Sequence, residues 1–159
     1  MSQGRVDQSR IEQSEGVGSL DQAVGYVLKR AATALRTAMD TALRPLDLTV
    51  PQYSCLEVLS QRPGLSNAEL ARAVFVTRQS MNLVLRGLQD RGLVTRPATA
   101  PQGRALPSTL TPAGRAQLHA ASIVVKTVEK RMLEPFSVTH QDRLLHDLAA
   151  CAEALANEK

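Results

Sequence analysis

The sequence has few of the residues that mark several common classes of protein. It contains no tryptophan, and only 3% of its residues are aromatic. Its two cysteines, Cys55 and Cys151, lie far apart and form no CxxC or metal-binding spacing, which excludes a disulfide scaffold. No segment approaches the ~18 consecutive apolar residues of a membrane helix. The polar N-terminus also lacks the apolar core of a signal peptide, so we expect a cytoplasmic protein.

The usual motifs of catalysis are missing as well. His119, His140 and His146 form neither an HExxH motif nor any other paired metal spacing. The sequence contains no GxSxG motif, no glycine-rich phosphate loop and no constellation of carboxylates. We therefore expect no enzymatic activity, no metal and no cofactor.

What the sequence does contain is enough apolar material for one helical domain with an added arm. The chain has 159 residues, of which 43% are hydrophobic, and Ala, Leu, Val and Arg are frequent. Residues 62–115 hold eight arginines and two acidic residues, a net charge of +6, whereas the remainder holds eleven basic and thirteen acidic residues, −2. A basic middle between near-neutral flanks indicates an anionic partner for the middle segment.

The first half of the chain shows a tail followed by two helices. Residues 1–18 have too few apolar side chains to become ordered, so we expect a disordered tail. A long apolar stripe predicts a helix that starts at Ser19, with Gln22 as its capping-box partner, and ends at Pro45. A second helix is predicted from Thr49, paired with Gln52, to about residue 61.

The middle segment has the pattern of a winged helix-turn-helix. Ser66 and Glu69 form a capping box for a short helix that ends near residue 74. After a three-residue turn, residues 74–76, Thr77 caps a helix that reaches residue 90 or 91, and Gly92 suits its left-handed end. Residues 93–96 and 106–110 then read as the two strands of a β-hairpin.

Two further helices complete the predicted chain. Thr111 caps the first, which has proline at its first position and ends at Pro135. Thr139 and Asp142 start the second. The fold class predicted is mainly α with a small β-hairpin wing, in which a winged helix-turn-helix is joined to long helices.

The helix that starts at Thr77 has two distinct faces. Met81, Val84, Leu85 and Leu88 form an inward apolar stripe, so the residues between them point outward. Gln and Asn can pair with adenine, Arg with guanine, and an apolar side chain with the thymine methyl group. The helix starts and the wing add groups that can bind phosphate or the minor groove. The predicted DNA contacts are Ser66, Thr77, Arg78, Gln79, Ser80, Asn82, Leu83, Arg86, Arg96 and Arg104.

These segments resemble MarR-type transcriptional regulators over about residues 20–155. The resemblance rests on PGLSNAELA, FVTRQSMN, LxxRGLV and LTPAG, in this order and spacing. It implies a homodimer that binds a pseudo-palindromic operator, usually as a repressor. It also implies a dimerisation domain of residues 19–48 and 111–159 around a DNA-binding domain of residues 49–110. The wing sequence Pro101-Gln102-Gly103-Arg104 lacks the family's usual acidic residue, which predicts a looser wing.

The resemblance further implies a small effector, often aromatic or phenolic, that enters a cleft between the two domains. Tyr26, Arg30, Tyr53 and His119 are the candidate ligand-binding residues, with ordinary structural roles as the alternative. A second alternative is an oxidant sensor that uses Cys55 or Cys151. A third is an interaction module that keeps the winged-helix shape without binding DNA.

Overall fold

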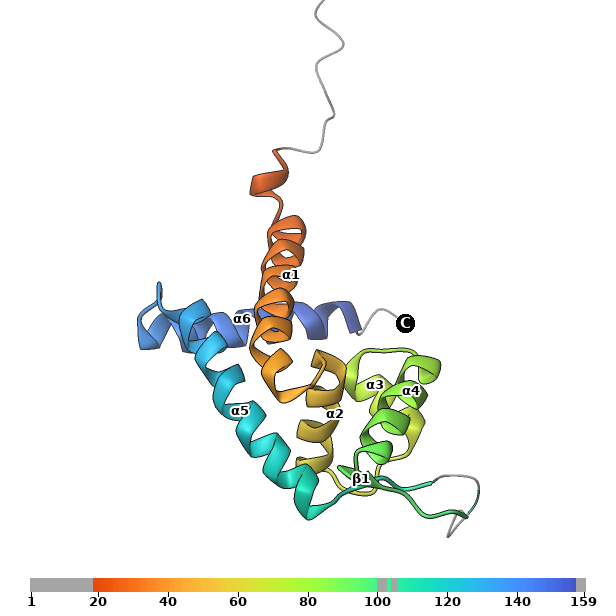
Figure 1. The fold of residues 1–159 in the computed structure, drawn as a ribbon. Coiled ribbons are helices and arrows are strands. Elements are labelled where there is room, and N and C mark those ends of the chain that lie inside the picture. Colours follow the sequence, from red (N-terminus) through yellow and green to blue (C-terminus); the bar gives the residue numbers. More distant parts are fainter. Residues whose placement is uncertain (1–18, 100–102, 104–105, 157–159) are drawn as a thin grey trace, which may run out of the picture. The chain divides into compact units, whose positions relative to one another are not determined.

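The computed structural model describes residues 19–99, 103 and 106–156, and helices dominate it (Figure 1). The chain divides into two compact units, residues 1–34 and residues 35–159. Helix α1 (Val24–Leu43) runs from the first unit into the second. Within the described ranges, no helix combines the length and the apolar character needed to cross a bilayer.

The first unit corrects the predicted start of the long helix. Ser19 makes no capping hydrogen bond, and a short 3₁₀ turn, η2 (Leu20–Gln22), follows it. Ala23 is extended and separates this turn from α1, so the α-helix begins at Val24. Leu20 and Val24 are both exposed, so no burial holds a continuous helix here. An ion pair of 3.1 Å between Asp21 and Arg30 connects the turn to α1 instead.

The second unit holds the apolar core. It contains the end of α1, the 3₁₀ turn η3 (Arg44–Leu46), α2 (Val50–Gln61), α3 (Asn67–Val74) and α4 (Arg78–Asp90). A two-stranded sheet and two further helices follow: β1 (Val94–Thr95), β2 (Thr109–Leu110), α5 (Pro112–Leu133) and α6 (Val138–Ala156). The fully buried large side chains come from the end of α1, α2, α3 and α4: Leu43, Cys55, Leu56, Leu59, Leu70, Met81, Leu85 and Leu88.

The wing sheet is shorter than the sequence predicts. Its antiparallel register pairs Val94 with Leu110 and Thr95 with Thr109, rather than whole strands over residues 93–96 and 106–110. Ser108 forms a bridge with Leu65, the residue before the α3 cap. This bridge uses the backbone groups of residue 108 that a longer hairpin would need, and it fastens the wing to the start of the helix-turn-helix.

The base of α5 is fixed to the end of α4. The Thr111 hydroxyl accepts a hydrogen bond from the Gly114 amide at 3.0 Å and donates one to the Gly92 carbonyl at 2.6 Å. Gly114 is buried, and a Cβ atom there would collide with the Leu93 carbonyl oxygen. Glycine at this position therefore lets the backbone of α5 approach the segment that follows α4.

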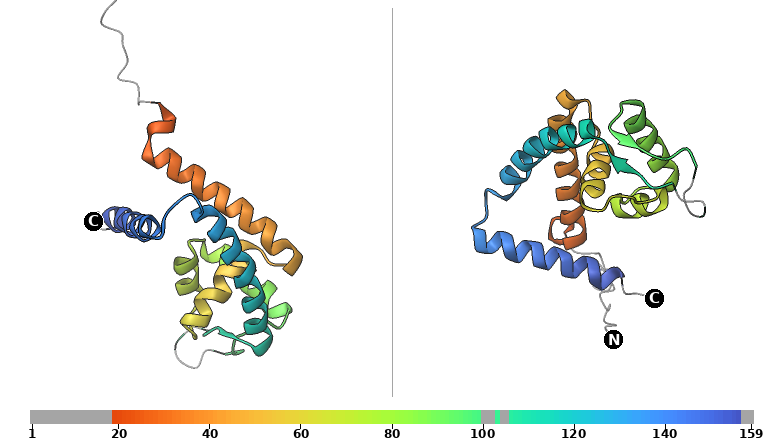
Figure 2. Two further views of the ribbon diagram at one scale, coloured as in Figure 1. Left: turned by 90° about the vertical axis from the view of Figure 1, so that its left-hand side faces the viewer. Right: turned by 90° about the horizontal axis from the view of Figure 1, so that it is seen from below.

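Helix α6 is different, because none of its residues is buried. It leaves the end of α5 at an angle, as the two views of Figure 2 show. It starts at Val138, one residue before the predicted Thr139, and the cap is supplied by the Ser137 hydroxyl, which accepts from the His140 amide at 3.4 Å.

Candidate nucleic-acid interface

A tightly capped short helix forms the first half of the helix-turn-helix. The Ser66 hydroxyl accepts from the Glu69 amide at 3.4 Å and donates to the Glu69 carboxylate at 2.7 Å. The same carboxylate accepts from the Ser66 amide at 2.8 Å, which completes the predicted capping box. These hydrogen bonds from Ser66 lower the pKa of Glu69. The Ser66 hydroxyl is thus already hydrogen-bonded within the helix. A phosphate that approached the N-terminal end of α3 would meet the Glu69 carboxylate beside it.

Three residues, Phe75, Val76 and the cap Thr77, separate α3 from α4, so the turn begins one residue later than the predicted residue 74. Helix α3 includes Val74 and ends at Phe75, which has a left-handed backbone with φ 60°. The Phe75 amide bonds to the Arg72 carbonyl, and the Val76 amide bonds to the Ala71 carbonyl at 3.0 Å. This pair of hydrogen bonds is a Schellman motif, which usually has glycine at the left-handed position. The Phe75 side chain is 94% exposed.

A side-chain hydrogen bond sets the start of α4 against α3. Asn67, the first residue of α3, donates from Nδ2 to the carbonyl of Arg78, the first residue of α4, at 3.2 Å. The Thr77 hydroxyl caps α4 by accepting from the Ser80 amide at 3.0 Å. Both ends of the turn are therefore held by side chains that the sequence places at helix starts.

The two faces of α4 lie as the sequence predicts. Met81, Leu85 and Leu88 are fully buried, and Val84 packs against them at the edge of the core. Leu83 is 65% exposed, although it is apolar. The other predicted contacts on this helix are exposed as well: Arg78, Gln79, Ser80, Asn82 and Arg86. The helix thus presents one continuous polar surface with one leucine in it.

The wing gives a mixed result for the predicted arginines. Arg96 is half-buried, and its Nε atom is buried without a hydrogen-bond partner among the described residues. Gly103 is exposed, with a left-handed φ of 62°. Arg104 and the predicted tail, residues 1–18, lie outside the described residues.

A comparison with known families matches the MarR family model to residues 46–105, which include α2 to α4 and β1. The HTH-type transcriptional repressor Rv2887 of Mycobacterium tuberculosis is 49% identical over 121 residues, which cover 76% of this chain and 87% of that protein. The chain belongs to the MarR family. It is a MarR-family transcriptional regulator, and its fold of helices with a small β-hairpin is that of the family.

Two solved structures of the M. tuberculosis MarR-family protein are similar to this chain. The structure of Rv2887 in complex with DNA has 43% sequence identity and a TM-score of 0.70, and the match covers 81% of this chain and 97% of that one. The complex of Rv2887 with salicylic acid has 46% identity and a TM-score of 0.68, and covers 81% and 96%. These matches extend well beyond the winged helix into the flanking helices.

The four residues predicted to bind an effector occupy different environments. In the first unit, Tyr26 is exposed and Arg30 forms the ion pair with Asp21. In the second unit, Tyr53 packs against the core, and its hydroxyl donates to Glu57 at 3.4 Å. Burial raises the pKa of Tyr53, although a hydrogen bond with Ser122 opposes that rise. His119 is exposed on α5. Their role in a MarR-family regulator stays a prediction.

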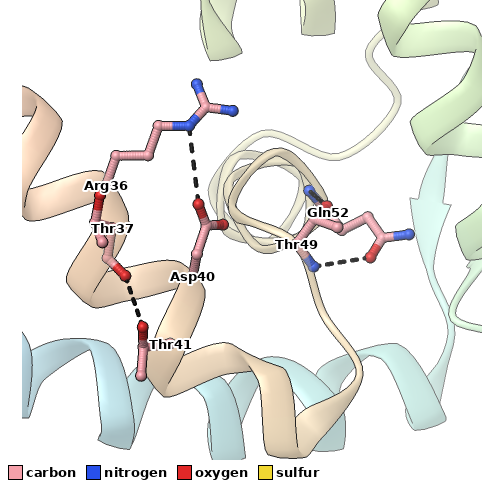
Figure 3. Close-up of polar contacts among 6 residues, drawn as sticks. All are labelled: Arg36, Thr37, Asp40, Thr41, Thr49 and Gln52. Atoms are coloured by element: carbon pink, nitrogen blue, oxygen red, sulfur yellow. Dashed lines mark hydrogen bonds and ion pairs between the residues drawn. The ribbon is translucent and has the colours of Figure 1, made fainter.

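A cavity of about 440 Å³ lies beside the C-terminal half of α4. It is lined by residues of α1, the α1–α2 connection, α2 and α4: Asp40, Arg44, Asp47, Leu48, Thr49, Gln52, Gly87 and Arg91. Figure 3 shows part of this region, with the Thr49–Gln52 capping box and the 4.0 Å pair between Arg36 and Asp40. No sequence pattern predicts this cavity, because its walls come from α1, α2 and α4, which are separate segments of the chain.

The two cysteines lie in opposite environments. Cys55 is buried in the core, and that burial raises its pKa to about 12. Cys151 is exposed on α6. Within the part of the chain that the structure describes, no group of three His, Cys, Asp or Glu side chains could hold a metal ion.

Proposed function

We propose that this chain is a homodimeric repressor that reads a specific DNA sequence with α4 and releases it when a small aromatic acid binds. The exposed face of α4 carries the proposal. Its buried stripe fixes the helix to the core while Gln79, Asn82 and Arg86 remain free to reach base edges. The similar protein Rv2887 has been crystallised in complex with DNA, which supports the same use of this face.

Each residue of this face has a chemical task in the proposed complex. Gln79 and Asn82 suit adenine, Arg86 suits guanine, and the exposed Leu83 suits a thymine methyl group. Thr77 caps α4, and Arg78 and Ser80 lie in its first turn, where the positive end of the helix dipole favours a phosphate. Arg96 and Arg104 would contact the DNA backbone or the minor groove from the wing.

We also propose that residues 19–48 and 111–159 form the dimerisation domain and residues 49–110 the DNA-binding domain. Helix α6 supports this division, because Leu145, Leu148 and Leu155 are exposed on it. A groove between the end of α5 and α6 is lined by Met132, Leu133 and Leu144 together with two of these leucines. Apolar side chains exposed in such numbers are typical of a surface that a second copy covers.

The effector proposed is an aromatic carboxylic acid. The similar protein Rv2887 has been crystallised with salicylic acid. In this chain, the cavity beside α4 offers the guanidinium group of Arg44, which can pair with a carboxylate. The four residues predicted from the sequence are the alternative binding site. An effector acts only if it binds the DNA-free conformation more tightly than the DNA-bound one.

We propose that the chain acts by binding rather than by catalysis, since its family consists of transcriptional regulators. We place it in the cytoplasm, where a bacterial regulator meets the chromosome.

The test is a footprint on the intergenic DNA beside the chain's own gene, followed by titrations of the protected duplex at two salt concentrations. We expect a protected pseudo-palindrome, with a steep loss of affinity as salt rises. Arg86→Ala should cost about 1–3 kcal/mol of binding free energy, mainly through lost base discrimination. Arg131→Ala, which removes an exposed arginine from the last turn of α5, is the matched control.

Two results would contradict the proposal. Weak binding that is the same for every duplex would argue against sequence reading by α4. Unchanged operator affinity of the Arg86→Ala variant would support an interaction module that has lost DNA binding.

A further inference from the structure

Arg91 ends α4, and its side chain turns back to another part of the fold. Its guanidinium donates from Nη1 to the carbonyl of Asp47 and from Nη2 to the carbonyl of Leu46 at 3.4 Å. These two carbonyls lie where η3 ends, in the connection between α1 and α2. A cation at the end of a helix is favourable, because the last carbonyl groups carry partial negative charge.

A second side chain binds the same connection from α5. Gln117 donates from Nε2 to the Leu46 carbonyl at 2.7 Å. The Leu46 carbonyl therefore accepts from α4 and from α5 at once. On either side of it, Leu43 and Leu48 are buried in the core, so the acceptor itself is firmly placed.

The segment directly after Arg91 is fixed to α5 as well. The Gly92 carbonyl accepts from the Thr111 hydroxyl, and the Leu93 carbonyl accepts from the Thr111 amide at 3.1 Å. The C-terminal end of α4 is thus held from two directions, by the α1–α2 connection through Arg91 and by the base of α5 through Thr111.

We infer that Arg91 is a positioning residue for DNA binding, which fixes the angle at which α4 is presented and does not itself contact DNA. This inference rests on the proposed function. It assigns a role to a residue of the basic middle segment that is distinct from that of its neighbours. At 1.5 Å per residue, Arg91 lies roughly 20 Å from the first residue of the 13-residue α4. Its charge is directed to two carbonyls instead of a phosphate.

The first test compares salt dependence among three variants. We expect Arg91→Ala to weaken operator binding by about tenfold, because a charged donor to two carbonyls is lost. The slope of log affinity against log salt should stay that of the wild type, since no phosphate contact is removed. Arg78→Ala, which removes a proposed phosphate contact at the other end of α4, should reduce that slope by about one. Arg91→Lys keeps the charge but not the paired donors, so it should recover only part of the affinity.

A second measurement does not depend on DNA. Spin labels at two exposed positions, introduced as Gln89→Cys and Lys126→Cys in a Cys151→Ser background, report the distance distribution between α4 and α5. We expect Arg91→Ala to broaden this distribution and Arg86→Ala to leave it unchanged. Gln117→Ala should broaden it too, and the double variant should show less than the sum of both effects, because the two donors share one acceptor.

The outcomes separate the two proposals. If the wild type does not discriminate between duplexes, the proposed function fails. The role of Arg91 is overturned if Arg91→Ala lowers the salt slope by about one, which would make it a phosphate contact. An unchanged affinity or an unchanged distance distribution in Arg91→Ala would overturn it equally.

Discussion

Phe75 shows how one residue can be held in an unfavourable state by its neighbours. Its left-handed backbone is one that bulky side chains rarely adopt, and its ring, being 94% exposed, gains almost nothing from burial. The same Schellman motif ends α4, where the left-handed residue is Gly92 with φ 67°. Phe75 and Gly92 therefore occupy the same position of the motif, one with a side chain and one without.

Phe75→Gly should therefore raise the free energy of unfolding by about 1 kcal/mol, since glycine relieves a left-handed strain of that order. Chemical denaturation of the purified protein measures it. Gly92→Ala is the matched reverse change. It should lower stability by a similar amount, because an added Cβ meets no atom within 4 Å and only the backbone conformation matters. A Phe75→Gly protein less stable than the wild type would show that the ring makes a contact worth more than the strain.

Cys55 and Cys151 should differ sharply in reactivity. The thiolate is the reactive form, and a pKa of about 12 leaves Cys55 protonated at neutral pH. A thiol reagent added to the native protein should modify one cysteine, Cys151, and both after unfolding. Mass spectrometry identifies the modified residue. Rapid modification of Cys55 in the native protein would contradict this expectation and support the oxidant-sensor alternative for that residue.

At the scale of the element, helix starts were the most predictable features. The boxes at Thr49 and Ser66 form as predicted, because each depends on two side chains three residues apart. Ser19 has the same spacing to Gln22 and fails, because the extended Ala23 interrupts the helix. The wing strands were overestimated because Ser108 pairs with Leu65, a partner that local patterns do not reveal.

In the candidate site too, local patterns were predictable from the sequence and tertiary contacts were not. The exposed and buried faces of α4 follow from helical periodicity, so Met81 and Asn82 are placed correctly by sequence alone. The contacts of Arg91 could not be predicted, because its acceptors are backbone carbonyls more than forty residues earlier in the chain. The environment of Arg96 was missed for a similar reason, since its burial depends on tertiary packing.

Ser66→Ala should change the acid titration of α3. The hydrogen bonds from Ser66 stabilise the charged form of Glu69 and lower its pKa in the folded state. That contribution to stability is present above the ordinary glutamate pKa of about 4.3 and is lost as pH falls through the lowered folded pKa. In Ser66→Ala, the pKa of Glu69 should move back up, which an NMR titration of its carboxyl carbon detects. Thr49→Ala removes the cap of α2, whose partner Gln52 does not titrate, and should leave Glu69 unchanged.

At the scale of the whole molecule, the exposed leucines of α6 form the surface on which the proposed assembly depends. Two recognition helices about one DNA turn apart, ~34 Å, require two copies of this chain. In the proposed complex, each copy contributes one α4 to one half of the operator.

Leu145→Asp combined with Leu148→Asp should yield a monomer, because two charges would be buried in the proposed dimer contact. Sedimentation velocity measures the mass, and operator affinity should fall at least about hundredfold as the two half-sites are no longer bound together. His146→Asp adds one charge at an exposed polar position of the same helix and should keep the dimer. A double variant that remains dimeric would place the dimer contact elsewhere.

The left-handed backbone of Asp47 and Phe75 has a consequence for how this regulator can evolve. Glycine at either position should relieve left-handed strain, and at position 47 it would keep the carbonyl that Arg91 binds, because that group belongs to the main chain. If α4 reads the operator as proposed, a new operator requires changes at the exposed residues of α4, and most substitutions destabilise a protein. Two positions outside that face can offset the loss by a single substitution each. The chain could therefore tolerate destabilising substitutions on α4 that change its DNA specificity, without any change to its core.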